Sequence, residues 1–111
     1  KMNLSFQMRS NDFYLGNPTN IAGYAFLLHA LSALFKLQPG KLVYQGSDVH
    51  LYTNQLENAR VQVQREPLPL PALKFLRRID SLEDMLSLQY SDIRIENYVH
   101  HPDLPRVEMA V

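Results

Sequence analysis

The sequence contains no cysteine and no tryptophan, and its charges balance at eleven lysines and arginines against eleven aspartates and glutamates. The lack of cysteine excludes disulfides, thiolate metal ligands and a cysteine nucleophile from these residues. The balanced charge leaves no overall field that would recruit nucleic acid or an anionic membrane. We therefore expect neither of these as a partner.

Long hydrophobic runs are also lacking. No apolar run reaches the ~18–20 residues that a membrane-spanning helix needs. The longest, residues 25–37, is interrupted by His29, Ser32 and Lys36. The first nine residues alternate between apolar and polar side chains instead of forming the apolar block of a signal peptide. We expect a cytoplasmic protein.

The length of 111 residues predicts one small domain, and a hydrophobic fraction of 46% is enough for a core. Residues 2–8 alternate with the period of a half-buried strand. Residues 21–37 are apolar nearly all round, which predicts a helix covered on every side, and Gln38-Pro39-Gly40 ends it. Residues 41–52 are typical of a strand with a bend or bulge at Gly46-Ser47.

The second half of the chain predicts shorter elements. A capping box of Asn54 and Glu57 starts a helix that reaches about Arg65. Three prolines then form a stiff extended linker, strands follow at residues 72–77 and 93–98, and a helical turn lies at 81–85. The fold class is α+β, with a mostly β framework around one buried helix.

A polar run, Arg9-Ser10-Asn11-Asp12, lies between the first strand and the apolar helix. We interpret it as a loop, where folds carry much of their chemistry. The guanidinium of Arg9 suits phosphate oxygens, and Ser10 adds a second donor; the alternative is an ordinary surface arginine.

A second candidate set follows the bend at Gly46-Ser47. Asp48, His50 and Tyr52 share one strand face, either as a solvated surface or as groups that hold a hydroxyl. Asp48 and His50 lack a third metal ligand at a sensible spacing, so we expect no metal site. His29, within the apolar helix, is interpreted as a core histidine.

Several short motifs occur in a specific order along essentially the whole chain. Taken together they resemble the C-terminal part of thymidylate synthase. They are Gln7-Met8-Arg9-Ser10-Asn11-Asp12, Leu15-Gly16, Pro18-Thr19-Asn20-Ile21-Ala22, Leu37-Gln38-Pro39-Gly40, Asp48-Val49-His50-Leu51-Tyr52, Arg65-Glu66-Pro67-Leu68-Pro69 and Glu108-Met109-Ala110-Val111.

The resemblance implies a role for each matched residue. Arg9 and Ser10 bind the phosphate of dUMP, with Asn11 beside them, and Asp12 lies where the nucleotide and the folate meet. Asn20 reads the uracil edge and, with Asp12, supports the reaction. His50 and Tyr52 hold the 3′-hydroxyl of deoxyribose. The folate side is implied to consist of Asp12, Leu15, Gly16, Ala110 and Val111.

The resemblance also implies the fold and the activity. The fold is a thymidylate synthase-like mixed sheet around one long buried helix, and residues 1–111 form the C-terminal part of its single domain. The activity is transfer of a one-carbon unit from 5,10-methylenetetrahydrofolate to dUMP, giving dTMP, by an obligate homodimer. The family's cysteine nucleophile lies upstream in the N-terminal half, so we expect the isolated 111 residues to be inactive without that remainder.

Two other functions stay open. One is a hydroxymethylase of the same superfamily, in which water replaces hydride; the amide of Asn20 favours dUMP over dCMP as its substrate. The other is a non-catalytic remnant that serves as a dimerisation module. The absence of cysteine favours the remnant, and the matched nucleotide residues oppose it.

Overall fold

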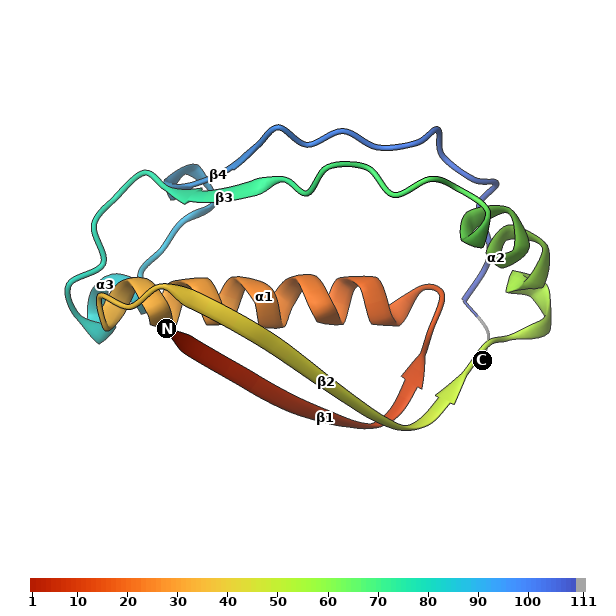
Figure 1. Cartoon of the computed structure of the whole chain (residues 1–111), viewed down its shortest axis with the longest axis horizontal. Coiled ribbons are helices and arrows are strands. Elements are labelled where there is room, and N and C mark those ends of the chain that lie inside the picture. The colour runs from red at the N-terminus through yellow and green to blue at the C-terminus, as the bar shows by residue number, and fades with distance from the viewer. Residues whose placement is uncertain (110–111) are drawn as a thin grey trace.

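A central helix, α1 (Gly16–Leu34), lies between two layers of extended chain in the computed structural model, which describes residues 1–109 (Figure 1). One layer consists of β1 (Met2–Asp12) and β2 (Pro39–His50), and the other contains β3 (Ala72–Phe75) and β4 (Ile93–Glu96). The remaining elements are η1 (Thr53–Gln55), α2 (Leu56–Val63), α3 (Leu82–Leu86) and η2 (Tyr90–Asp92). The predicted α+β class is confirmed.

The strands form two separate sheets of two strands each. β1 pairs with β2 in parallel, and β3 pairs with β4 antiparallel. Parallel neighbours need a long crossover connection, which α1 provides. The single mixed sheet expected from the sequence is therefore not present within residues 1–109.

The alternation predicted for the first strand is confirmed. Phe6 is buried and stacks on Tyr24 of α1, with ring centroids 3.8 Å apart, and Met2, Leu4 and Met8 share its side of the strand. The residues between them, Asn3, Ser5 and Gln7, are exposed.

The polar run that we interpreted as a loop is instead the end of β1. Asn11 pairs with Val49 of β2, and Asp12 pairs with His50. The hydrogen-bonded pairing of the two strands continues because β2 runs beside β1 as far as His50. The polar side chains of Arg9–Asp12 do not interrupt it.

The bulge predicted at Gly46-Ser47 is wrong, because Met8 pairs with Gly46 and the register continues to Asp12 and His50. The irregularity lies between Met2 and Leu4. A side chain at Gly46 would collide with the hydroxyl of Tyr44 and with Val49. Close packing therefore favours glycine at this position.

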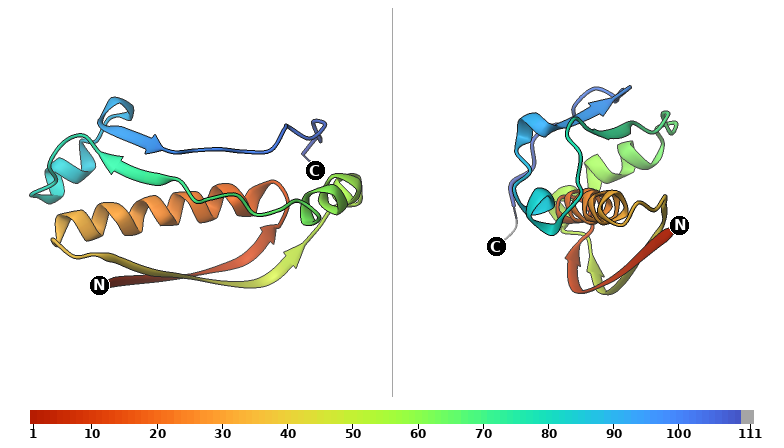
Figure 2. Two further views of the ribbon diagram at one scale, coloured as in Figure 1. Left: turned by 45° about the horizontal axis from the view of Figure 1, so that its top comes forward. Right: turned by 90° about the vertical axis from the view of Figure 1, so that its left-hand side faces the viewer.

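Helix α1 is central but only partly buried. Leu28, Ala30 and Ser32 are buried, whereas Ala22, Gly23 and Leu27 are exposed. The two layers cover two sides of the helix and leave the others open (Figure 2). The burial on every side that the sequence predicted is not found among the described residues.

The end of α1 differs from the prediction because Lys36 adopts a left-handed backbone conformation, with φ of 56°. The amide of Leu37 then donates to the carbonyl of Ser32 at 2.8 Å, which closes the helix. The ammonium of Lys36 donates to the carbonyl of Ile79 and to Asp80, and this bond lowers the pKa of the Asp80 carboxyl. The helix end is thereby tied to the chain that follows β3.

The second half of the chain follows the prediction with shorter elements. Phe75 of β3 packs edge-on against Phe26 of α1, with ring centroids 5.8 Å apart. The predicted helical turn is α3, where the hydroxyl of Ser81 accepts from the amide of Asp84. Hydrogen bonds from the amides of Asp80 and Ser81, partly offset by desolvation, lower the pKa of the Asp84 carboxyl.

The prediction that Asn54 and Glu57 form a capping box is wrong. The side chain of Asn54 donates to the carbonyl of Glu108, and Glu57 faces Arg60 instead. The chain enters α2 through η1, where the side chain of Gln55 accepts from the amide of Tyr52 at 3.0 Å.

No helix within residues 1–109 is long and apolar enough to span a membrane.

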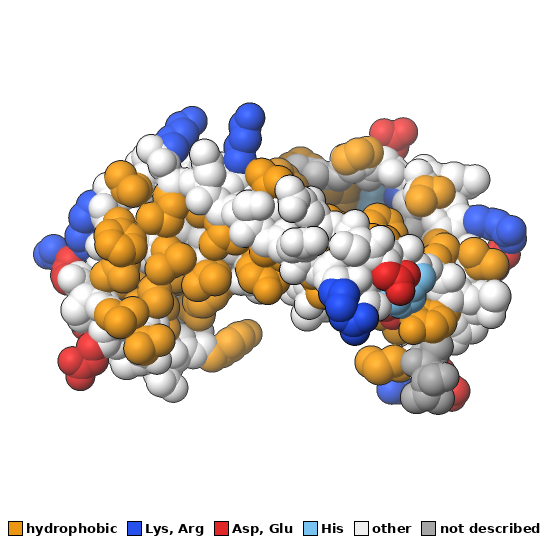
Figure 3. Space-filling view, turned by 90° about the horizontal axis from the view of Figure 1, so that it is seen from below, with side chains coloured by type: hydrophobic (Ala, Val, Ile, Leu, Met, Phe, Trp, Pro, Cys, Tyr) orange, Lys and Arg blue, Asp and Glu red, His pale blue; other side chains and the backbone are white. Residues whose placement is uncertain are grey.

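Much apolar surface is left uncovered. Hydrophobic side chains gather over the half of the molecule that holds the C-terminal end of α1 (Figure 3). Phe35 is 61% exposed, and Val43 and Val49 of β2 are each 43% exposed. Parallel sheets are normally covered on both faces, and a sheet of two strands has two unpaired edges.

We expect the 111-residue chain to associate. Because α1 already covers Met2, Leu4, Phe6 and Met8, the association must use the sheet edges and the uncovered apolar side chains. Light scattering at about tens of micromolar, within the range where such surfaces self-associate, should give a mass above that of one chain. A monomer at that concentration would contradict this.

Candidate functional site

The ends of β1 and β2 meet at one edge of the structure. The parallel register places Ser10 opposite Asp48, and Asp12 opposite His50. Helix α1 begins at Gly16, four residues beyond β1. The carboxyl ends of parallel strands next to a helix start are a common place for ligand binding. The two polar motifs of the sequence are therefore brought together here.

Asp12 organises the turn from β1 into α1. Its Oδ1 accepts hydrogen bonds from the amides of Tyr14, at 3.1 Å, and Leu15, at 3.2 Å. Its Oδ2 accepts from Nε2 of Gln55 at 3.2 Å. An aspartate that binds the backbone two and three residues ahead is a common turn former, and this turn explains why the helix starts earlier than residue 21.

Gln55 is a residue of this site that sequence reasoning missed. Its side chain is fully buried, and both ends of its amide are paired: Nε2 donates to Asp12, and Oε1 accepts from the amide of Tyr52. It thus connects the end of β1 to the chain just after β2. A single glutamine in a polar stretch carries no sequence signal for this role.

Asn11 is 3% exposed, and its Nδ2 donates to Oδ1 of Asn17 and to the hydroxyl of Tyr44, both at 2.8 Å. These bonds join β1 to the first turn of α1 and to β2. Buried amides in proteins are normally paired in this way. Asn17 and Tyr44 are further residues of the site that the sequence did not indicate.

Gly16 is the point where three candidate side chains converge. A Cβ atom built at Gly16 would lie 3.6 Å from Oδ1 of Asn11, from Oδ1 of Asn20 and from Cβ of Asp12. The structure therefore brings Asn20, one helical turn into α1, next to the end of β1. Two amide oxygens and a carboxylate lie around the start of the helix.

His50 and Tyr52 form a second pair. Their rings meet edge to face with centroids 5.1 Å apart, although β2 ends at His50 and Tyr52 belongs to the following turn. Nδ1 of His50 lies 3.2 Å from the carbonyl of Asp48 and 3.5 Å from its carboxylate. With Nδ1 donating, Nε2 is left as an acceptor, and the Tyr52 hydroxyl can donate or accept.

Arg9 lies apart from the residues around Gly16. It is exposed and has the outward parity of Asn3, Ser5 and Gln7 on β1, whereas Ser10 is half-buried on the other parity. The structure thus groups Asn11, Asp12 and Asn20 around Gly16, whereas Arg9 is exposed.

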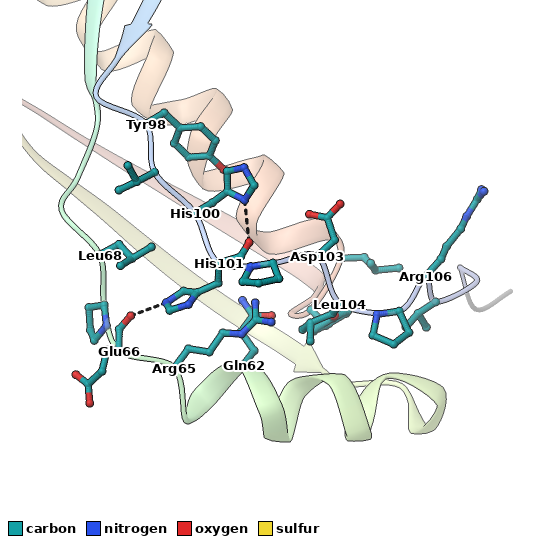
Figure 4. Close-up of a pocket in the computed structure, with 17 residues that line it drawn as sticks. Gln62, Arg65, Glu66, Leu68, Tyr98, His100, His101, Asp103, Leu104 and Arg106 are labelled. Atoms are coloured by element: carbon teal, nitrogen blue, oxygen red, sulfur yellow. Dashed lines mark hydrogen bonds between the residues drawn. The ribbon is translucent and has the colours of Figure 1, made fainter.

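Leu15 opens onto two cavities between the helix start and the C-terminal segment. One, of about 890 Å³, is lined by Tyr14 and Leu15, by Gln62 of α2, by residues 65–68 that follow this helix and by residues 98–107 (Figure 4). The other, of about 610 Å³, lies between Leu15 and residues 106–109. The candidates Ala110 and Val111 lie outside the described residues.

Charged and polar side chains surround the larger cavity. Arg65, His101 and Arg106 contribute to its lining together with Glu66 and Asp103. The part of the chain that the structure describes contains no group of three histidine, aspartate or glutamate side chains placed to hold a metal ion.

Comparison with known proteins gives one consistent family. The family model described as thymidylate synthase matches residues 1–111. A thymidylate synthase of Francisella tularensis subsp. holarctica is 42% identical over 102 residues, and one of Francisella philomiragia is 40% identical over the same length. Each alignment covers 92% of this chain and 36% of the relative, so the chain spans little more than a third of these curated relatives.

Replacing Gln55 by leucine should lower the free energy of unfolding by about 2–6 kcal/mol, because Oδ2 of Asp12 and the amide of Tyr52 each lose a buried partner worth about 1–3 kcal/mol. Urea denaturation measures the change. Gln64→Leu, at an exposed position just past α2, is the control and should stay within about 0.5 kcal/mol of the parent. Equal stability of the two variants would show that Gln55 holds nothing together.

Proposed function

Because the chain belongs to the thymidylate synthase family, we propose that it takes part in the transfer of a one-carbon unit from 5,10-methylenetetrahydrofolate to C5 of dUMP, giving dTMP. In this reaction a thiolate adds to C6 of the pyrimidine and makes C5 nucleophilic. The observation that carries the proposal is the parallel register of β1 and β2, which places Asp12 opposite His50. Residues of the two polar motifs, 38 positions apart in the sequence, thereby lie at the same edge of the β1–β2 sheet.

The chain supplies the nucleotide contacts in this proposal. Asn20 faces the uracil ring, since its amide offers an acceptor for N3–H and a donor for O4. The same donor would support the negative charge that develops on the ring. Its position beside Gly16, together with Asn11 and Asp12, supports this assignment.

Other residues of the two polar motifs contact the sugar and the phosphate in this proposal. His50 and Tyr52 bind the 3′-hydroxyl: Nε2 of His50 accepts from it and the tyrosine hydroxyl donates to it. Ser10 and Arg9 bind the phosphate. The outward parity of Arg9 means that the phosphate lies toward the outer side of β1, or that the arginine turns back over the strand end when the nucleotide binds.

The folate lies on the side of Leu15 and Gly16 and meets the nucleotide near Asp12. Volumes of about 890 and 610 Å³ beside Leu15 are within the range of ligand pockets, and support this position. Ala110 and Val111 complete the folate side. No metal takes part.

The remaining partners are proposals of the same kind. The nucleophilic cysteine comes from an N-terminal remainder of the protein, and two copies form a homodimer through the outer face of the β1–β2 sheet. That face carries Val43 and Val49 between polar side chains. The cytoplasmic location and the independence from nucleic acid stay predictions.

Replacing Asn20 by aspartate in the protein completed with its N-terminal remainder should reduce affinity for dUMP by about tenfold to a hundredfold, since O4 loses its donor at about 1–3 kcal/mol. Affinity for dCMP should rise relative to dUMP, because an acceptor suits the exocyclic amine of cytosine. Titration calorimetry with both nucleotides measures the change.

Two other variants serve as controls. Arg9→Ala should weaken dUMP and dCMP alike, because a phosphate contact carries no base information, and Asn97→Asp, on the exposed loop after β4, should change neither. An equal loss for both nucleotides in Asn20→Asp would mean that Asn20 does not read the base.

The 111-residue chain by itself should form no covalent adduct with 5-fluoro-dUMP and methylenetetrahydrofolate, because it contains no thiol. Denaturing mass spectrometry should give the unmodified mass for this chain and an added mass for the completed protein. A stable adduct on these residues would contradict the assignment of the nucleophile to the proposed N-terminal remainder.

A further inference from the structure

The C-terminal segment, residues 97–109, is held in place by side chains and not by a sheet. We call these residues the tail. The tail contains no helix or strand, and within residues 1–109 no backbone-to-backbone hydrogen bond joins it to another segment. It nevertheless follows a defined path beside the extended chain after α2 (Figures 1 and 2).

Three side-chain contacts connect the tail to residues 54–66. Nδ2 of Asn58 donates to the carbonyl of Pro105 at 2.7 Å, and Nδ2 of Asn54 donates to the carbonyl of Glu108 at 3.0 Å. Nε2 of His101 lies 2.8 Å from the carbonyl of Glu66. Two of the three contacts thus come from asparagines that donate to tail carbonyls.

The spacing of the two asparagines fits the tail. Asn54 and Asn58 are four residues apart on continuous helical backbone, so they lie on the same side of it. Asn58 is 8% exposed and Asn54 is exposed, so the contact of Asn58 with Pro105 is the one shielded from water. A buried donor that loses its partner is more costly than an exposed one.

The tail forms one wall of both cavities beside Leu15. Residues 98–107 line the larger cavity and residues 106–109 line the smaller one. The carbonyls of Pro105 and Glu108 that the asparagines bind lie within these walls. A shift of the tail at those carbonyls therefore changes the shape of the space next to Leu15.

We propose that Asn58, assisted by Asn54, is a positioning residue that fixes the tail as a wall of the folate pocket. The inference rests on the proposed function for the identity of the ligand. Since no backbone-to-backbone hydrogen bond within residues 1–109 joins the tail to another segment, the tail can leave and return without unpairing any strand. Asn58 thereby acts on folate binding and not on dUMP, whose proposed contacts lie on β1, α1 and the end of β2.

The experiment compares Asn58→Asp with the parent in the completed protein, because aspartate keeps the shape of asparagine but offers no donor to the Pro105 carbonyl. We expect the KM for methylenetetrahydrofolate to rise about tenfold, which corresponds to about 1.4 kcal/mol. The Kd for dUMP should stay within about twofold. Amide hydrogen exchange of residues 103–109 should accelerate by a similar factor of about ten.

Two further variants keep the test decisive. Asn54→Ala alters an exposed residue, so it should fold if Asn58→Asp does not, and it should shift both folate KM and tail exchange in the same direction by about two- to threefold. Glu57→Gln, the neighbour of Asn58 on the solvent side of α2, is the matched control and should leave both unchanged.

Unchanged tail exchange in Asn58→Asp and Asn54→Ala would overturn the inference, as would equal losses for dUMP and folate. A parent protein that binds neither dUMP nor methylenetetrahydrofolate overturns the proposed function before any variant is made. Tail exchange would still report separately whether the asparagines anchor the tail.

Discussion

The carboxylate of Asp12 joins three parts of the chain at the edge where the candidate residues meet. It ends β1, it accepts the two amides that turn the chain into α1, and it receives the side chain of Gln55 from the turn after β2. Each of these bonds is to a charged acceptor, which makes it stronger than a bond between neutral groups. The turn that leads into Gly16, and the buried side chain of Gln55, depend on this carboxylate.

The parallel pairing of β1 and β2 supplies the second constraint. It requires a crossover, and α1 is that crossover: the helix starts at the edge where both strands end and runs back to the start of β2. The polar ends of the strands and the polar first turn of the helix then lie together. The apolar parts of the same elements, represented by Phe6 and Tyr24, lie further along and form the core.

The exposed apolar surface is what the proposed remainder and second copy would have to cover. The chain covers 36% of the relatives it matches, and α1 is open on the sides that its two layers do not reach. A helix with few polar side chains is stable in water only when other chain covers it. The uncovered side chains of α1 and β2 are therefore the surfaces on which the proposed remainder and second copy would pack.

The α+β class, the alternation of β1, the central helix and the family could be predicted from the sequence, because they depend on local periodicity and on short motifs in order. The sequence did not determine that Arg9–Asp12 is strand, that Asn54 binds the tail, or that Gln55 is buried between Asp12 and Tyr52. Those features depend on contacts between segments that are 38 or more positions apart in the sequence. The same type of polar residue occurs in a loop, at the end of a strand or in a buried hydrogen bond, depending on its neighbours. Only the tertiary structure decides among them, because a hydrogen bond between distant residues leaves no periodic trace in the chain.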